Sequence, residues 1–225
     1  MSKDIEDICQ LYKLAPASWE RLIENQQIAV NIINEVIAKK CTTKEAVRNI
    51  VNAHSKGTKD LRINFGFLGI VYKDMVKNHG IIYDKELDQL LKKKSGRGMS
   101  GVHVVTSFLS PFPGVDLRAE EGLYEKLVQL QIEEGTAGAF SCSKNCAFCS
   151  APPGTGRSYD PKEPGVMRAI QCLYDEILMM RSTMRKFIAI GQTPTKLEFL
   201  ILGGTWSSFT REYRENFIRR SIFAA

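Results

Sequence analysis

The chain has 225 residues, and its 31 Lys and Arg against 25 Asp and Glu give a net charge of +6, with 44% hydrophobic residues. These values are typical of globular proteins and exclude a collagen-like, low-complexity or largely disordered chain. No apolar run approaches the roughly 20 residues of a membrane span, and the N-terminal MSKDIEDICQ lacks the apolar core of a secretory signal. We therefore expect a cytoplasmic protein, with the nucleus as the alternative, and no membrane partner. Its six cysteines are then expected as thiols or metal ligands and not as disulfides.

Residues 1–94 predict a helical region. Apolar residues recur at three- and four-residue spacing from Trp19 to Ile37, which predicts an amphipathic helix that ends near Lys40. Capping and stop residues predict three further helices after it, over residues 44–56, 67–79 and 85–94.

A basic, glycine-containing segment marks the boundary after this region. Its cations are Lys92, Lys93, Lys94 and Arg97. One interpretation is a solvated linker, and the other is a patch that contacts the phosphates of a nucleic acid. The mild overall excess of base permits nucleic-acid binding without indicating it.

The pattern changes over residues 95–225. Strands are predicted over 102–109 and 197–202, and helices over 121–134, over 164–190 and from a cap at Thr210 onward. The order of strand, inserted segment, helix, strand and helix is typical of an α/β sheet or barrel.

Three cysteines lie close together, and Cys142, Cys146 and Cys149 have the spacing C-x3-C-x2-C. Such a loop can direct three thiolates at one [4Fe–4S] cluster and leave one iron free for a small molecule. This is the spacing of the radical S-adenosylmethionine enzymes, in which the free iron binds the cofactor. The alternatives are unrelated buried thiols, or a structural zinc site that recruits Cys172 or His103 as its fourth ligand.

A glycine turn comes after the predicted strand 197–202, and its residues are Gly203, Gly204 and Thr205. Two glycines after a strand are explained by a simple turn. After a cysteine loop they also match the turn that presents backbone groups to S-adenosylmethionine, where a side chain would block the approach. Loops at the carboxyl ends of barrel strands are where the chemistry of barrels takes place.

Several segments together resemble the catalytic subunit of Elongator, the radical S-adenosylmethionine enzyme of tRNA wobble-uridine modification, also called a tRNA acetyltransferase. The matching segments are Ser100–Val105, Cys142–Cys149, Arg157–Pro164, Met167–Ile170, Lys196–Trp206 and Glu212–Arg214. The likeness is strong over residues 95–110 and 140–215 and faint over the first 90. It implies a helical, tRNA-binding region over 1–94, followed over 95–225 by the first βα units of a partial TIM-type barrel.

The resemblance also implies a chemistry. The cluster cleaves S-adenosylmethionine to a 5′-deoxyadenosyl radical, which takes hydrogen from acetyl-CoA, and the carbon radical adds to C5 of the wobble uridine. By resemblance Cys142, Cys146 and Cys149 hold the cluster, Gly203, Gly204 and Thr205 form the cofactor turn, and the partners are tRNA and other Elongator subunits. Three further residues match family positions near the site without an assigned role, namely Tyr159, Glu163 and Arg168.

The chain departs from the family pattern in three places. An insertion is expected at about 114–141, and Ser-Ala-Pro-Pro-Gly comes after Cys149 where the family has Pro-Gly-Gly. The chain ends at Ala225 with two predicted strands, whereas an eight-unit barrel takes about 200 residues or more. From the resemblance we expect these residues not to include the acetyl-CoA domain of the family, so acetyl-CoA is expected as a cofactor only where another domain supplies it.

The sequence leaves three functional hypotheses open. The first is a radical enzyme subunit, or a fragment of one. The second is a non-catalytic tRNA-binding or scaffold remnant of the family. The third is a zinc-stabilised structural protein.

Overall fold

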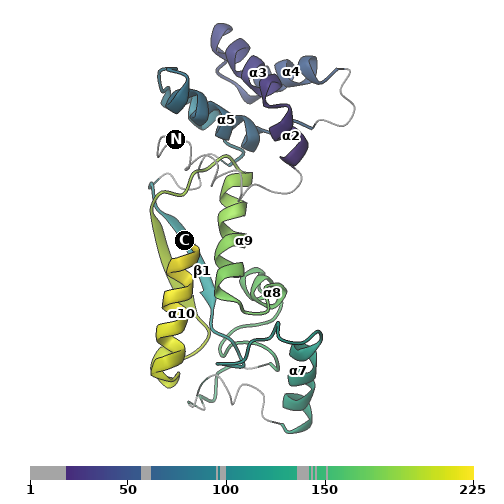
Figure 1. Ribbon diagram of the computed structural model, residues 1–225, viewed down its shortest axis with the longest axis vertical. Coiled ribbons are helices and arrows are strands. Elements are labelled where there is room, and N and C mark those ends of the chain that lie inside the picture. Colours follow the sequence, from purple (N-terminus) through teal and green to yellow (C-terminus); the bar gives the residue numbers. More distant parts are fainter. Residues whose placement is uncertain are drawn as a thin grey trace. The chain divides into compact units, whose positions relative to one another are not determined.

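The computed structural model describes residues 19–56, 62–94, 96, 100–135, 142, 144, 146–150 and 152–225. The chain forms two compact units (Figure 1). The first contains the described residues up to His103 together with Met184–Lys196, and the second contains Val104–Thr183 and Leu197–Ala225.

The first unit is helical, as predicted. Its helices up to residue 91 are α2 (Glu20–Glu24), α3 (Gln26–Ala38), α4 (Lys44–Ser55), α5 (Phe65–Asn78) and α6 (Lys85–Leu91). The single helix predicted to end near Lys40 is divided at Asn25, whose side chain donates a hydrogen bond to the Arg21 carbonyl (2.8 Å). The predicted caps are confirmed, because Thr43 accepts from the Ala46 amide (3.2 Å) and Asp84 from the Glu86 amide (2.8 Å).

The core of the first unit lies between α3, α4 and α5. The apolar faces of these helices are buried together, and their largest members are Ile32, Ile33, Phe67, Leu68 and Tyr72. Gly66 of α5 is required by close packing, because a Cβ there would lie 2.2 Å from the Ala189 carbonyl oxygen. The helix predicted over 85–94 is three residues too long, since α6 ends at Leu91 and Lys92 has an extended backbone (ψ 135°).

In the described part of the chain the sheet has two strands, β1 (His103–Phe108) and β2 (Leu197–Leu202). The His103 amide donates to the Lys196 carbonyl (2.9 Å), and the Leu109 amide donates to the Leu202 carbonyl (2.7 Å). Both strands advance in the same direction between these two bonds, so they are parallel. The predicted mixture of α and β structure is thereby confirmed, with helix predominating.

The helices of the second unit are α7 (Leu123–Glu133), α8 (Pro164–Gln171), the start of α9 (Glu176–Ala189) and α10 (Arg211–Ala224), and a short 3-10 turn covers Trp206–Ser208. The prediction of one helix over 164–190 is wrong, because Leu173 (φ 49°) and Tyr174 (φ 53°) adopt left-handed conformations that separate α8 from α9. Asp175 then accepts from the Leu178 amide (2.8 Å) and starts the second helix. No helix in the described ranges is both long and apolar enough to cross a membrane.

Candidate functional site

The cysteine loop is closed at its base by backbone hydrogen bonds. The Cys149 amide donates to the Cys146 carbonyl (3.0 Å), which forms a tight turn, and the Ser158 amide donates to the Ser150 carbonyl (2.8 Å). The Cys149 sulfur also lies 3.4 Å from the Ser158 hydroxyl oxygen. Ser158 (φ 73°) therefore fastens the loop through both its backbone and its side chain, a contact that the cysteine spacing alone did not indicate.

The first cysteine of the motif lies against the segment that comes after β2. Cys142 is buried, and its sulfur is 3.9 Å from the Ser208 hydroxyl oxygen. Burial raises the pKa of the Cys142 thiol, but hydrogen bonds from Thr205, Lys144 and Ser208 outweigh it and lower that pKa to about 7. The structure therefore brings Cys142 and Thr205 together, although they are far apart in the sequence.

The second acidified thiol belongs to Cys149. The hydrogen bond with Ser158 is the main cause that lowers its pKa, and Arg157 acts in the same direction. Thiolates, not thiols, are the nucleophiles and metal ligands. Two of the three motif cysteines thus have environments that favour the ligand form.

The fit of this loop to a metal centre is mixed. Within the described residues no three His, Cys, Asp or Glu side chains are gathered closely enough to hold a metal ion. The Cys142 and Cys149 sulfurs instead contact separate hydroxyl groups, while Cys146 is exposed. The motif nevertheless offers three cysteine ligands, and the thiol pKa is lowered in two of them, which fits a cluster held by three cysteines.

The glycine turn has the geometry that only glycine adopts readily. Gly203 (φ 113°) and Gly204 (φ 112°) both lie in the left-handed half of backbone space. A Cβ at Gly203 would lie 3.2 Å from the Leu109 amide nitrogen, and one at Gly156 would lie 3.1 Å from the Gly203 Cα. The segment after the cysteine loop therefore packs directly against this turn, at the carboxyl end of both strands.

The three matched residues without an assigned role have structural contacts. Tyr159 meets Phe108 edge to face, with 5.0 Å between ring centroids. The Glu163 carbonyl accepts from Met167 at the start of α8 (2.9 Å). Arg168 donates from Nη1 to the Thr183 hydroxyl (3.3 Å), which links α8 to α9.

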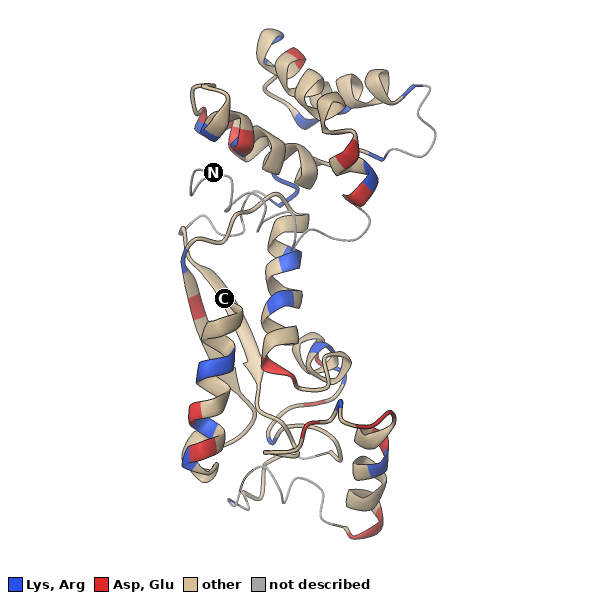
Figure 2. Cartoon of the chain, viewed as in Figure 1, with Lys and Arg blue, Asp and Glu red and all other residues tan. Residues whose placement is uncertain are grey.

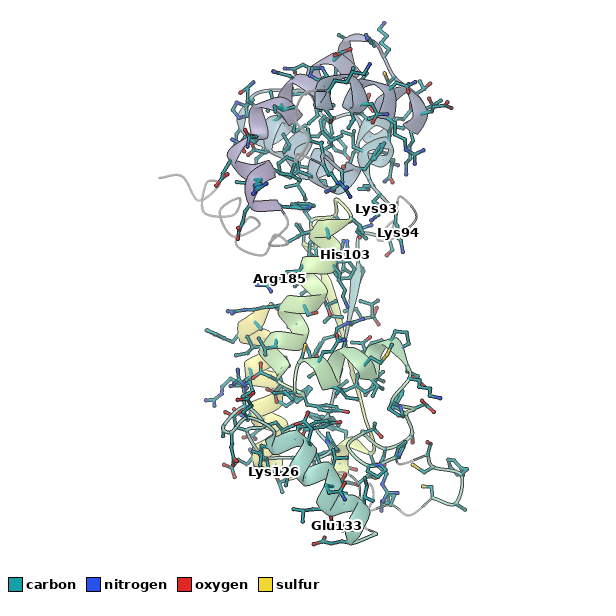
Figure 3. The ribbon with its side chains drawn as sticks, turned by 90° about the vertical axis from the view of Figure 1, so that its right-hand side faces the viewer. Lys93, Lys94, His103, Lys126, Glu133 and Arg185 are labelled. Atoms are coloured by element: carbon teal, nitrogen blue, oxygen red, sulfur yellow. The ribbon has the colours of Figure 1, made fainter. Side chains whose placement is uncertain are left out.

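The basic segment contains one partly buried and two exposed lysines. The Lys92 ammonium, with its side chain 14% exposed, lies 2.7 Å from the buried Asp88 carboxylate. Lys93 and Lys94 have exposed side chains (Figure 3), and their backbone is held by bonds with Ile190 and Gln192. Arg97 lies outside the described residues.

The candidate fourth ligands of a zinc site are both buried in packed surroundings. Cys172 ends α8 and belongs to a hydrophobic cluster of the second unit. His103 belongs to the first unit, where its ring meets Phe187 edge to face at 4.8 Å between centroids. Burial lowers the pKa of His103.

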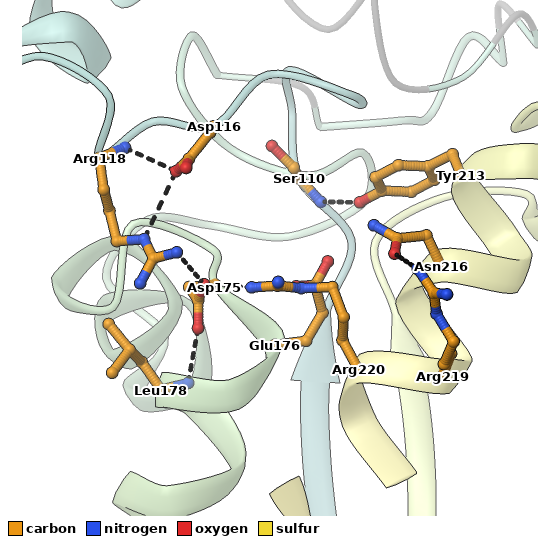
Figure 4. Close-up of polar contacts among 10 residues, drawn as sticks. All are labelled: Ser110, Asp116, Arg118, Asp175, Glu176, Leu178, Tyr213, Asn216, Arg219 and Arg220. Carbon is orange, nitrogen blue, oxygen red and sulfur yellow. Dashed lines mark hydrogen bonds and ion pairs between the residues drawn. The ribbon is translucent and has the colours of Figure 1, made fainter. Parts of the chain in front are cut away.

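A charged network in the second unit was not predicted from the sequence. The buried Asp175 carboxylate accepts from Arg118 (2.9 Å) and Arg220 (2.6 Å), and Glu176 accepts from Arg220 (2.8 Å) (Figure 4). A pocket of about 180 Å³ adjoins it, and its lining also includes Ser110, which comes after β1, and Tyr213 and Asn216 of α10. Cations and anions alternate along α10 (Figure 2), so this surface has no single sign of charge. The network fastens α10 to the start of α9.

Comparison with known proteins finds relatives named Elongator complex protein 3. Human Elongator complex protein 3 is 35% identical over 79 residues, which cover 33% of this chain and 14% of the human protein. The Saccharomyces cerevisiae protein of that name is 35% identical over 78 residues, or 32% of this chain and 14% of the yeast protein.

A longer match is found with Elongator complex protein 3 of Dictyostelium discoideum, which is 28% identical over 192 residues, or 79% of this chain and 30% of that protein. The chain thus spans less than a third of the length of these relatives. No protein-family model matches the chain. The predicted resemblance is confirmed, because over these segments the chain is similar to Elongator complex protein 3.

Proposed function

We propose that this chain is an iron–sulfur protein of tRNA wobble-uridine modification and that it binds S-adenosylmethionine. One observation carries the proposal: the Cys142 thiol, with a pKa lowered to about 7, lies against Thr205 and Ser208, beside the glycine turn. A cofactor bound to a cluster at Cys142 would therefore be within reach of the backbone of that turn. The relationship to Elongator complex protein 3 supports the same assignment.

Each residue then has a defined role. Cys142, Cys146 and Cys149 hold a [4Fe–4S] cluster as thiolates. When bound, the cluster supplies the electron for reductive cleavage of the sulfonium. Gly203 and Gly204 leave the backbone beside the site free of side chains, which lets a cofactor approach closely.

The proposal extends to the fold and the partners. We assign β1 and β2 as the first two strands of a partial barrel, which their parallel pairing and the turn at their carboxyl ends support. Other Elongator subunits are the proposed protein partners. Acetyl-CoA enters only where another domain binds it.

Anaerobic reconstitution with iron and sulfide tests the cluster. We expect a brown protein that contains about four irons, and we expect Cys146→Ala to lose most of that iron. Cys41→Ala, which removes a half-buried thiol of the first unit, is the matched control and should bind iron normally. A colourless protein, or one that binds a single zinc, would refute the proposal, and zinc would favour the structural alternative.

A second candidate function is tRNA binding without catalysis. The exposed Lys93 and Lys94, on a backbone segment held by hydrogen bonds, favour it. Salt-dependent tRNA binding together with a failure to cleave S-adenosylmethionine would support this alternative. Cleavage to 5′-deoxyadenosine by the reduced protein would exclude it.

A further inference from the structure

We infer that helix α7, which lies within the inserted segment 114–141, positions the cysteine loop by clamping the backbone of Gly154. The inference concerns residues that carry no role in the proposed cluster. Its consequence for the cluster rests on the proposed function, but its consequence for the loop does not.

The clamp consists of three side chains on one glycine. The Tyr124 hydroxyl donates to the Gly154 carbonyl (2.8 Å), and the Tyr174 hydroxyl donates to the same oxygen (3.0 Å). The Gly154 amide donates to the Gln131 side-chain oxygen (2.8 Å). Two of the three residues belong to α7, and together they satisfy both polar groups of a buried peptide backbone.

The packing of this contact leaves no room for a side chain. Gly154 has φ +74°, and a Cβ there would lie 2.6 Å from both the Tyr124 hydroxyl oxygen and a Val128 methyl group. Tyr124 and Val128 pack in turn on the hydrophobic cluster that contains Phe112 and Tyr174. Helix α7 is therefore anchored to the second unit at the same place where it holds Gly154.

The polar side chains of the clamp keep the hydrogen-bond donors and acceptors that hold Gly154. Burial raises the pKa of Tyr124 to about 12 and also raises that of Tyr174, so both hydroxyls remain donors at neutral pH. Gln131 is 1% exposed, and its amide nitrogen has no partner among the described residues. Burying the side-chain NH2 group of Gln131 without a partner is unfavourable. The hydrogen bond that the Gln131 side-chain oxygen accepts from the Gly154 backbone offsets that cost.

The position of Gly154 is transmitted to the site along a short segment. Gly156 packs on Gly203 of the glycine turn, and Ser158 holds Cys149 through its hydroxyl group and Ser150 through its amide. A displacement of Gly154 therefore moves the contacts of both the turn and the last cysteine. Tyr124 and Gln131 are positioning residues, because they act on the cysteines only through this segment.

The test compares two glutamines on one helix. Gln131→Met removes the acceptor of the Gly154 amide and keeps an unbranched side chain. Gln129→Met is the matched control, because Gln129 is exposed and its side chain donates to Glu133 of the same helix. Tyr124→Phe is a milder second variant that removes one hydrogen bond and retains the ring, and it decides the question where Gln131→Met does not fold by circular dichroism.

The first readout is the alkylation rate of each cysteine in the metal-free protein, mapped by mass spectrometry. We expect Cys149 to react about tenfold faster in Gln131→Met, which corresponds to about 1.4 kcal/mol for the lost hydrogen bond, and severalfold faster in Tyr124→Phe. Cys41, in the first unit, should react at the same rate in every variant. Equal Cys149 rates in the wild type, Gln129→Met and the folded clamp variants would overturn the inference.

The second readout is the electron paramagnetic resonance spectrum of the reduced, reconstituted protein. A clamp that positions the cluster loop predicts a broadened or shifted signal in the clamp variants and an unchanged signal in Gln129→Met. If the wild type binds no iron while the alkylation contrast persists, the proposed cluster fails and the positioning role stands. An identical signal, together with identical alkylation rates, refutes the positioning role and leaves the cluster intact.

Discussion

Lys93 and Lys94, but not Lys92, should govern the salt dependence of tRNA binding. Lys92 is engaged with the buried Asp88 carboxylate at 2.7 Å, and its own carbonyl accepts from Lys44 (2.9 Å). The side chains of Lys93 and Lys94 are exposed and have room to approach a phosphate. Lys93 and Lys94 are therefore the candidate phosphate contacts among these three lysines, and Lys92 has a structural role.

The magnitude can be worked out from counterion release. Each neutralised phosphate adds about 0.7 to 0.9 to the slope of log K against log salt, so Lys93→Gln with Lys94→Gln should reduce the slope by about 1.6. Over a fourfold increase in salt, this removes roughly a tenfold change in affinity. Lys92→Gln should leave the slope unchanged but destabilise the first unit by roughly 3 kcal/mol, because it leaves Asp88 buried without its nearest cation.

These slopes are measured by fluorescence anisotropy with labelled tRNA. The salt concentration is varied between about 50 and 200 mM, a range over which phosphate contacts change the affinity strongly. Circular dichroism and urea unfolding identify any variant that has lost its fold. Either of two results would refute this division of the lysines: a folded Lys92→Gln that reduces the slope as much as Lys93→Gln, or a double variant with the wild-type slope.

Three further predictions concern stability. Burial lowers the pKa of Lys73 to about 8. Between about pH 7.5 and 9.5 the unfolded chain therefore binds the proton more often than the folded one, so the free energy of unfolding should rise with pH by about 2 kcal/mol, and urea titrations of Lys73→Met should lose that rise. Gly203→Ala places a Cβ 3.2 Å from a backbone nitrogen at φ +113°, and should lower the melting temperature more than Gly114→Ala, which has φ +85° and open space around it. Arg220→Gln should destabilise the second unit by about 2 kcal/mol because Asp175 and Glu176 are buried, whereas Arg211→Gln breaks an exposed pair and should cost about 0.5 kcal/mol or less in the same urea assay. The Lys73 assignment would be contradicted if the difference in unfolding free energy between the wild type and Lys73→Met did not change with pH. Equal losses of stability in Gly203→Ala and Gly114→Ala would contradict the assignment of the glycine turn. Equal losses in Arg220→Gln and Arg211→Gln would contradict that of the buried network.

Local signals in the sequence were sufficient for most elements and for the relationship to Elongator complex protein 3. Caps such as Thr43, Asp84 and Thr210 act on neighbouring amides, so their hydrogen bonds can be inferred from residue type and spacing. The two strands were likewise predicted, over 102–109 and 197–202, from β-branched or apolar runs that end in turn residues, and they are observed as β1 (His103–Phe108) and β2 (Leu197–Leu202). Such signals depend on contacts within a few residues, and these are the contacts that a sequence specifies most directly.

Contacts between distant segments were decided only by the tertiary structure. At the break between α8 and α9 Tyr174 has a left-handed conformation, and its ring is buried with its hydroxyl group bound to the Gly154 carbonyl, a contact that its residue type does not indicate. The Lys92–Asp88 ion pair is local, since the two residues are four apart, but the burial of Asp88 that distinguishes Lys92 from Lys93 depends on the packing of the first unit. Residue type and local spacing determined the cysteine triad, the glycine turn and the capped helices. Long-range packing decided which thiol lies beside that turn and which helix holds the loop, because the free energy of those contacts depends on residues that the chain brings together only when it folds.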